Sequence, residues 1–191
     1  MNDIEQRIKI NGVKNGLLLG VIITALSIGS YYFITSGSAS PILFVAAPIF
    51  FSVFIPIFCV VFFCFNARKQ IGGFWTFKQA TTGIFTMFLI AYLVQFIGKD
   101  IVFDKVIEPG NIQKTQTAAI NAKTTILKQR GNSQKAIDSD IGEMKKDFSQ
   151  QQNVSVGSTI QGIVISILFI FLLALIFGSL FKKDPPYLQP A

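Results

Sequence analysis

Four long apolar runs, none of which contains a charged side chain, take up almost half of this 191-residue chain. An α-helix rises about 1.5 Å per residue, so a run of about 20 residues crosses a hydrocarbon core about 30 Å thick. The runs therefore predict an all-α, polytopic membrane protein with four transmembrane helices. With their flanking residues, the predicted spans cover about 15–35, 42–65, 76–98 and 158–181.

The composition supports one membrane domain that fills residues 1–191. The chain is 51% hydrophobic and contains 20 Phe, which is more apolar than a soluble domain of this size. A polar segment, residues 99–157, separates the third run from the fourth, and residues 182–191 form a short tail. We expect the segment to be an inserted helical hairpin.

Lysine and arginine mark one side of the membrane. The loop between the first two runs has none, whereas the other short segments carry Arg7, Lys9, Lys14, Arg68, Lys69, Lys78, Lys182 and Lys183. Short loops rich in these residues stay in the cytoplasm. We therefore expect both termini, the 66–78 loop and the 182–191 tail to be cytoplasmic, and residues 99–157 to lie on the other side.

The polar segment carries helix signals. Pro109 and Gly110 break the preceding helix, and a Gly131-Asn132 turn divides the remainder of the segment into two halves. In its second half apolar residues recur at spacings of four, three and four, which is typical of one helix face; these are Ile137, Ile141, Met144 and Phe148. We predict two antiparallel helices that stand outside the membrane. This stripe is a candidate docking surface; a purely structural hairpin and a polar loop are the alternatives.

Small residues recur at every fourth position in the first and fourth runs. Such stripes let transmembrane helices approach closely; the candidate packing seam consists of Gly12, Gly16, Gly20, Gly162 and Ser166. The pattern predicts that spans 1 and 4 pack on each other or form an oligomer seam. In span 2, Pro48 and Pro56 each remove a backbone donor and should bend the helix.

The residue types do not indicate catalysis. The chain has no histidine, and the four runs contain no ionisable carboxylate, lysine or arginine, although such groups usually mark proton and ion pathways in membranes. Cys59 and Cys64 have neither disulfide nor metal-ligand spacing. We expect no enzyme activity, no catalytic residue, no cofactor and no metal. The basic residues flank apolar runs, so we expect a lipid bilayer and not nucleic acid as their partner.

Three segments resemble a known family: residues 14–20, residues 67–80 with Arg68-x-x-x-Gly72-Gly73 and Phe77-Lys78, and residues 106–109. They are similar to uncharacterised four-span inner-membrane proteins typical of the Bacteroidota, a domain of unknown function. The resemblance implies the inner membrane of a bacterial envelope, with 99–157 in the periplasm, and implies no activity. It makes Arg68, Gly72, Gly73, Phe77 and Lys78 a candidate lipid or partner contact; topological anchoring is the alternative.

Three functions fit these observations. The first is a non-catalytic accessory or scaffold subunit of an envelope complex, which binds a protein partner or another copy of itself through its spans and hairpin. The second is a small oligomeric transporter or channel, for which Thr, Ser and Gln95 would line the path. The third is a lipid-binding protein that uses the basic foot of span 3.

Overall fold

The protein is all-α, as predicted, and we describe it from a computed structural model over residues 3–36, 40–152 and 156–184. Four helical rods are long and apolar enough to cross a membrane. Residues 185–191 of the predicted tail lie outside the described residues. The elements are α1 (Asp3–Thr35), α2 (Pro41–Ile49), η1 (Phe50–Phe54), α3 (Ile55–Gln70), α4 (Phe77–Gln95), η2 (Phe96–Ile107), α5 (Asn111–Gln129), α6 (Gln134–Gln152) and α7 (Val156–Phe181).

Three of the rods extend clearly beyond the predicted spans; the second continues to Gln70, past residue 65. α1 begins at Asp3, well before residue 15. α4 continues through η2 to Ile107, so the hairpin begins at Asn111 and not at residue 99. The continuation mixes apolar residues with four charged ones (Lys99, Asp100, Asp104 and Lys105), and it ends where Pro109 and Gly110 interrupt the helix.

The glycine stripe of α1 packs on α4. A Cβ atom at Gly12 would lie 2.9 Å from the carbonyl oxygen of Gly83, and one at Gly16 would lie 2.6 Å from that of Met87. At Gly20 it would lie 2.6 Å from Cβ of Val94. Only glycine permits this approach, and α1 and α4 share the most extensive contact among the described helices.

α7 also packs on α4, and this corrects the predicted pairing of spans 1 and 4. The contact lies in the half of α7 nearer the C-terminus, where Ala174 and Gly178 are buried and Gly178 meets Thr81. Gly162, in the other half, is exposed and has no neighbour within 4 Å among the described residues; Ser166 is half-buried. These two residues are therefore not part of a seam with α1, and their role as an oligomer seam stays a prediction.

The second span is one rod with an altered helical pitch at its centre. The π-helical η1 lies between Pro48 and Pro56, and the N–H of Ile55 bonds the carbonyl oxygen of Phe50, five residues earlier. Proline at 56 has no N–H to return to the carbonyl of Ser52. The irregularity expected from the two prolines is thus a widened turn.

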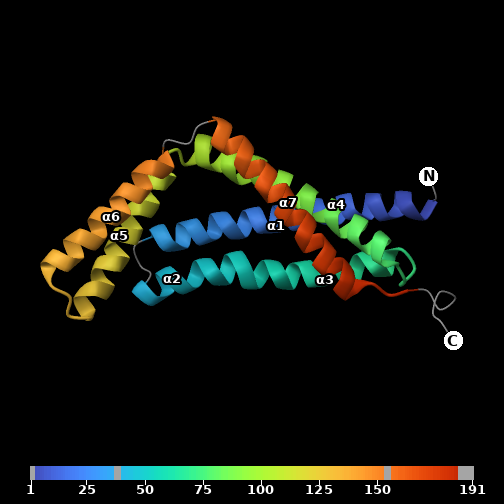
Figure 1. The fold of residues 1–191 in the computed structure, drawn as a ribbon, viewed down its shortest axis with the longest axis horizontal. Coiled ribbons are helices and arrows are strands. Elements are labelled where there is room, and N and C mark those ends of the chain that lie inside the picture. Colours follow the sequence, from blue (N-terminus) through green and yellow to red (C-terminus); the bar gives the residue numbers. More distant parts are fainter. Residues whose placement is uncertain (1–2, 37–39, 153–155, 185–191) are drawn as a thin grey trace.

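The hairpin lies across one end of the bundle (Figure 1). α5 packs on α6, and Lys123 on α5 forms a 3.3 Å ion pair with Asp140 on α6. α5 also contacts α1 and α2, so the hairpin is folded back over the ends of two spans and does not stand freely away from them. The start of α1, the end of α7 and the turn between α3 and α4 lie at the opposite end.

Candidate functional site

At the end opposite the hairpin, the turn between α3 and α4 holds the end of α7. Nε1 of Trp75 donates to the carbonyl oxygen of Phe181 at 2.7 Å, and Nη1 of Arg68 donates to the same oxygen at 3.3 Å. The backbones of Trp75 and Lys183 exchange hydrogen bonds of 2.9 and 3.1 Å. We call Arg68, Trp75, Phe181 and Lys183 the clamp. Its donors satisfy a carbonyl that the end of a helix leaves without a partner.

The clamp separates the residues of the candidate basic foot. Gly72 and Gly73 have φ values of 106° and 85°, which lets the chain turn sharply between the two spans. Arg68 is directed to α7 and lies over the ring of Phe65, 5.3 Å from its centroid. Phe77 and Lys78, in contrast, are exposed on the first turn of α4. Arg68 is therefore held by the clamp, and a lipid or partner contact made by the other four residues stays a prediction.

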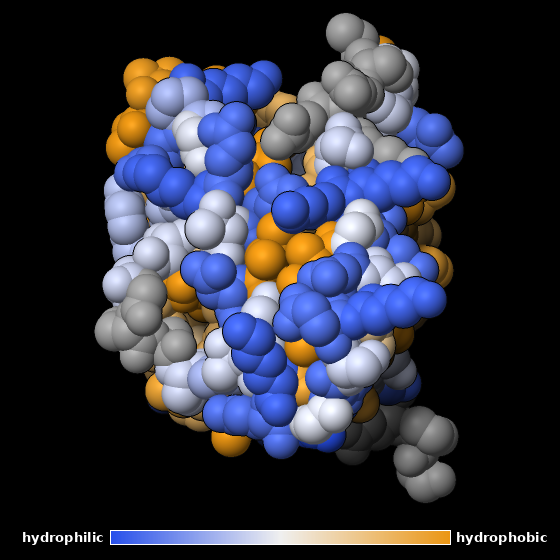
Figure 2. All heavy atoms as spheres, turned by 90° about the vertical axis from the view of Figure 1, so that its left-hand side faces the viewer, coloured by the Kyte–Doolittle hydropathy of each residue, from blue (hydrophilic) through white to orange (hydrophobic). Residues whose placement is uncertain are grey.

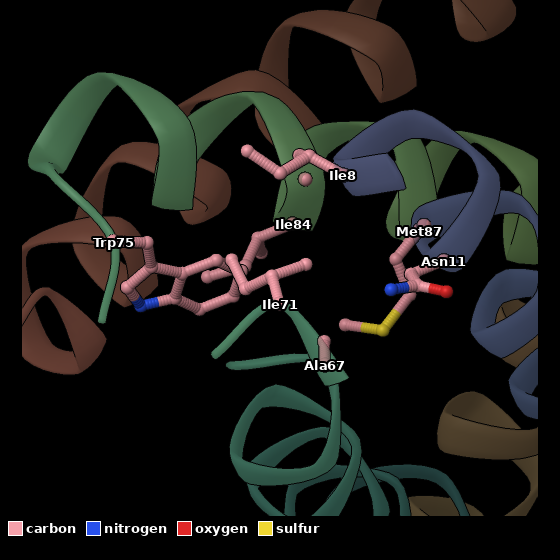
Figure 3. A pocket seen from close by; sticks show the side chains of 9 residues that line it. Ile8, Asn11, Ala67, Ile71, Trp75, Ile84 and Met87 are labelled. Atoms are coloured by element: carbon pink, nitrogen blue, oxygen red, sulfur yellow. The ribbon is translucent and has the colours of Figure 1, made fainter. Parts of the chain in front are cut away.

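Behind the clamp, Trp75 closes a very small cavity. The indole is 1% exposed and packs with side chains of α1, α3 and α4 (Figure 3). The cavity has a volume of about 10 Å³, which is room for about one water molecule. Its lining includes Ile8, Asn11, Ile84 and Met87. This place therefore offers a packed core and no ligand site.

A much larger cleft lies between α7 and the second span. Figure 1 shows α7 diverging from α2 and η1 toward the hairpin end, with α1 visible between them. The cleft has a volume of about 630 Å³. Val53, Ile57 and Phe169 on its walls are 45%, 51% and 60% exposed, so it opens sideways. Its lining is mostly apolar and includes Leu19, Ile23, Val60, Phe88, Ile170 and Phe177.

The cleft continues into a polar mouth at the hairpin end. Ser27, Ser52 and Gln95 line both spaces, which makes them contiguous. The mouth has a volume of about 350 Å³. Its other polar lining residues are Ser30, Tyr31, Lys99, Asp104, Asn111 and Thr115. The last two belong to the first turns of α5, so the hairpin contributes to the mouth.

Both π-helical segments contribute to this site. η1 supplies Ser52 and Val53 to the cleft, and η2 supplies Lys99 and Asp104 to the mouth. A π-helical turn changes the direction in which side chains leave the helix, and such turns often occur at functional sites. Here they bring serine, lysine and aspartate to one continuous space.

The charged residues of the mouth are already in contact. Nζ of Lys99 lies 2.8 Å from Oδ2 of Asp104 and 3.5 Å from Oδ1 of the more exposed Asp100. Oδ1 of Asp104 is buried and has no hydrogen-bond partner among the described residues. A buried acceptor without a donor is unfavourable.

A second ion pair fixes the base of the hairpin beside the mouth. Nζ of Lys114 lies 2.7 Å from Oε2 of Glu108, and the hydroxyl of Tyr31 donates to the same oxygen at 3.4 Å. The hydrogen bond from Lys114 lowers the pKa of Glu108, and the reciprocal bond raises the pKa of Lys114. Since these residues come from α1, the η2–α5 junction and α5, the pair ties the hairpin to the first span.

The candidate docking stripe of α6 is largely turned inward. Ile137 is 2% exposed and belongs to the interior of the hairpin. Ile141, Met144 and Phe148 are half-buried. Ile137 is therefore not accessible to a partner while the hairpin is closed, and the other three are accessible in part.

A known family covers all of these features. The family described as "Protein of unknown function (DUF4199)" matches residues 14–183. The chain belongs to the DUF4199 family. No curated protein and no solved structure matches it. The residues of the clamp, the cleft, the mouth and the hairpin lie within this matched region.

Sequence reasoning missed the cleft and found only parts of its lining. Gln95 is recognisable as a polar residue at depth, and Lys99, Asp100 and Asp104 as charges at a membrane boundary. Nothing in their spacing indicates that they share a space with Ser27 and Ser52 of other spans. The prolines of span 2 are the one local signal of the widened turn. A bend in that helix does not predict on which of its sides a cleft forms.

Proposed function

We propose that this DUF4199 protein is a non-catalytic protein of the bacterial inner membrane that holds one lipid molecule in the cleft between α7 and the second span. The observation that carries the proposal is the continuity of an apolar, laterally open cleft with a polar mouth at one end of the bundle. This sequence of surfaces matches an acyl chain followed by a headgroup. Ligand sites in general combine an apolar wall with a few placed polar groups.

The orientation supports a lipid of the outer leaflet. The eight basic residues of the short segments lie on the stretches around the clamp end, and the mouth lies at the opposite end. By the positive-inside rule the clamp end faces the cytoplasm. The mouth and the hairpin then face the periplasm, at the level of the outer headgroups.

Native mass spectrometry of the full chain, purified from membranes in a mild detergent, tests lipid binding. Ser52→Trp places a large side chain where the cleft meets the mouth, and we expect it to lower the retained phospholipid severalfold. Ser179→Trp makes the same change at an exposed site of α7 outside the cleft lining, and we expect it to have no effect. Equal retention in both variants would rule out the cleft as a lipid site.

An accessory role through the hairpin is a second candidate function. α6 packs on α5, and Figure 2 shows that the end of the molecule formed by the hairpin is mainly hydrophilic, with apolar surface between the polar side chains. Lys135, Glu143, Lys145 and Lys146 are exposed on α6. A polar surface with apolar patches suits a protein partner in the periplasm.

Quantitative mass spectrometry of proteins that co-purify with the chain tests the accessory role. We expect a stoichiometric partner that is lost when Lys145 and Lys146 are both changed to Glu. Lys9→Glu, at an exposed site near the other end, should retain the partner. A chain that purifies with no stoichiometric protein would argue against this role.

A further inference from the structure

The mouth of the cleft combines one positive and one negative side chain. Of its described lining residues, Lys99 is the basic one and Asp104 the acidic one. Asp100 also lies near Lys99, but it is 49% exposed at its side chain and does not line the mouth. The ligand surface is therefore zwitterionic, with no excess of either charge.

Asp104 keeps acceptor capacity on the side of the mouth. Its side chain is 22% exposed, whereas its Oδ1 is buried and has no hydrogen-bond partner among the described residues, so a ligand reaches the carboxylate at Oδ2. Oδ2 accepts from Lys99, and a carboxylate oxygen has room for a second donor. A bound ammonium would supply that donor in a charge-assisted hydrogen bond.

Lys99 and the start of α5 offer the complementary surface. The lysine ammonium has three donor hydrogens, and its short contact to Asp104 uses one of them. Asn111 and Thr115 line the same space from the first turns of α5. The positive end of the α5 dipole adds to the attraction for an anionic group.

We propose that the mouth recognises a phospholipid headgroup that bears a primary amine, the chemistry of phosphatidylethanolamine. The phosphate accepts from Lys99, and the ammonium donates to Oδ2 of Asp104. A choline headgroup has no N–H to donate to that oxygen, and an anionic glycerol headgroup brings a net negative charge toward the carboxylate. The inference rests on the proposed lipid function and adds headgroup specificity to it. A headgroup that cannot donate to Asp104 should bind more weakly, because it does not form that hydrogen bond.

The test is a titration of the delipidated full chain, followed by native mass spectrometry. The probes are phosphatidylethanolamine, its N,N-dimethyl derivative, phosphatidylcholine and phosphatidylglycerol, all with the same acyl chains. A hydrogen bond between charged groups changes affinity by roughly tenfold to a hundredfold. We expect phosphatidylethanolamine to bind tighter than phosphatidylcholine by about this factor, with the dimethyl lipid between them.

Two matched variants locate the specificity. Asp104→Asn should bring the affinities for phosphatidylethanolamine and phosphatidylcholine close together. Asp100→Asn removes the other carboxylate near Lys99 and should preserve their ratio. Because the headgroup series on the unaltered chain needs no variant, the inference stays testable even if Asp104→Asn does not fold.

The outcomes separate the inference from the proposed function. Equal binding of the four lipids, all weakened by Ser52→Trp, would overturn the amine specificity and leave the lipid site standing. Tighter binding of phosphatidylglycerol would also overturn it. Binding that Ser52→Trp does not change, or a second copy of the chain in place of lipid, would overturn both.

Discussion

A single carbonyl oxygen, that of Phe181, receives two side-chain donors from the turn between α3 and α4. Helix ends leave such carbonyls unpaired, and an unpaired polar group at a membrane boundary is costly. The residue arrangement therefore explains why arginine, two glycines and tryptophan occur within one short segment. Arginine and tryptophan supply the donors, and the glycines allow the turn that aims them.

Trp75→Phe removes the indole donor and keeps an aromatic ring. We expect it to destabilise the protein by about 1–3 kcal/mol, because the carbonyl of Phe181 loses its shorter hydrogen bond in a buried place. Thermal unfolding in detergent, followed by circular dichroism, measures the change. Phe77→Leu, at an exposed site outside the clamp, should shift the midpoint little, and an equal shift in both variants would count against the clamp.

Gly16→Ala and Gly29→Ala form a matched pair on α1. Alanine in place of glycine inside a helix normally stabilises by roughly 0.5–1 kcal/mol, and we expect this at Gly29, which has no neighbour within 4 Å among the described residues. At Gly16 the new Cβ meets the Met87 carbonyl oxygen at 2.6 Å, so the helices must separate and the midpoint should fall. Shifts of the same sign at both sites would contradict the close approach of α1 to α4.

Of the clamp residues, the sequence singles out Arg68 as a candidate contact, and it does not predict the arrangement of the four. The sequence indicates a glycine turn and a basic, aromatic helix start, and aromatic residues at a span end are typical of the membrane interface. Trp75 is buried instead of interfacial, because the end of α7 lies over it. Phe181, which accepts the hydrogen bond from Trp75, is 106 residues away in the chain, so no local sequence pattern predicts this contact.

At the scale of helices, the sequence predicts the spans well and their pairing poorly. Long charge-free runs have one explanation, so the four spans and the hairpin follow from composition and periodicity. Lipid tails are as apolar as the side chains, so no hydrophobic face identifies a neighbour. Stripes of small residues occur on both α1 and α7. The stripe of α1 packs on α4, whereas part of the stripe of α7 contacts no other helix among the described residues.

The hairpin should respond to acid through Glu108. Its pKa is lowered in the folded protein, so the bond to Lys114 contributes fully above the ordinary pKa of about 4.5 and is lost as the pH falls through the lowered value. We expect hydrogen exchange in the first turns of α5, corrected for intrinsic rates, to increase below that pH. Glu108→Gln should show little further increase on acidification, and the same increase in both proteins would exclude Glu108 as the cause.

At the scale of the whole molecule, the two ends of the helical bundle differ both in charge and in structure. One end has the start of α1, the end of α7, the clamp and the basic short segments, and the other has the mouth and the hairpin. The basic end predicts a cytoplasmic face by the positive-inside rule. This orientation decides which membrane leaflet the proposed lipid site faces.

Labelling of single cysteines in intact cells tests the orientation. In a background in which Cys59 and Cys64 are serine, Asn132→Cys at the hairpin turn should react with a membrane-impermeant maleimide after the outer membrane is opened. Lys69→Cys, near the clamp, should react only after lysis. The reverse pattern would invert the topology and place the mouth in the inner leaflet.

The clamp also constrains the order in which the protein can be completed. Its donors belong to the segment between the second and third spans, and its acceptor belongs to the end of the last span. During synthesis the first three spans enter the membrane before that acceptor exists. Until α7 is inserted in the correct direction, the Trp75 indole and the Arg68 guanidinium lack their shared partner. An unfinished or inverted chain therefore leaves both donors without this acceptor at the clamp end, in addition to lacking the packing of α7 on α4.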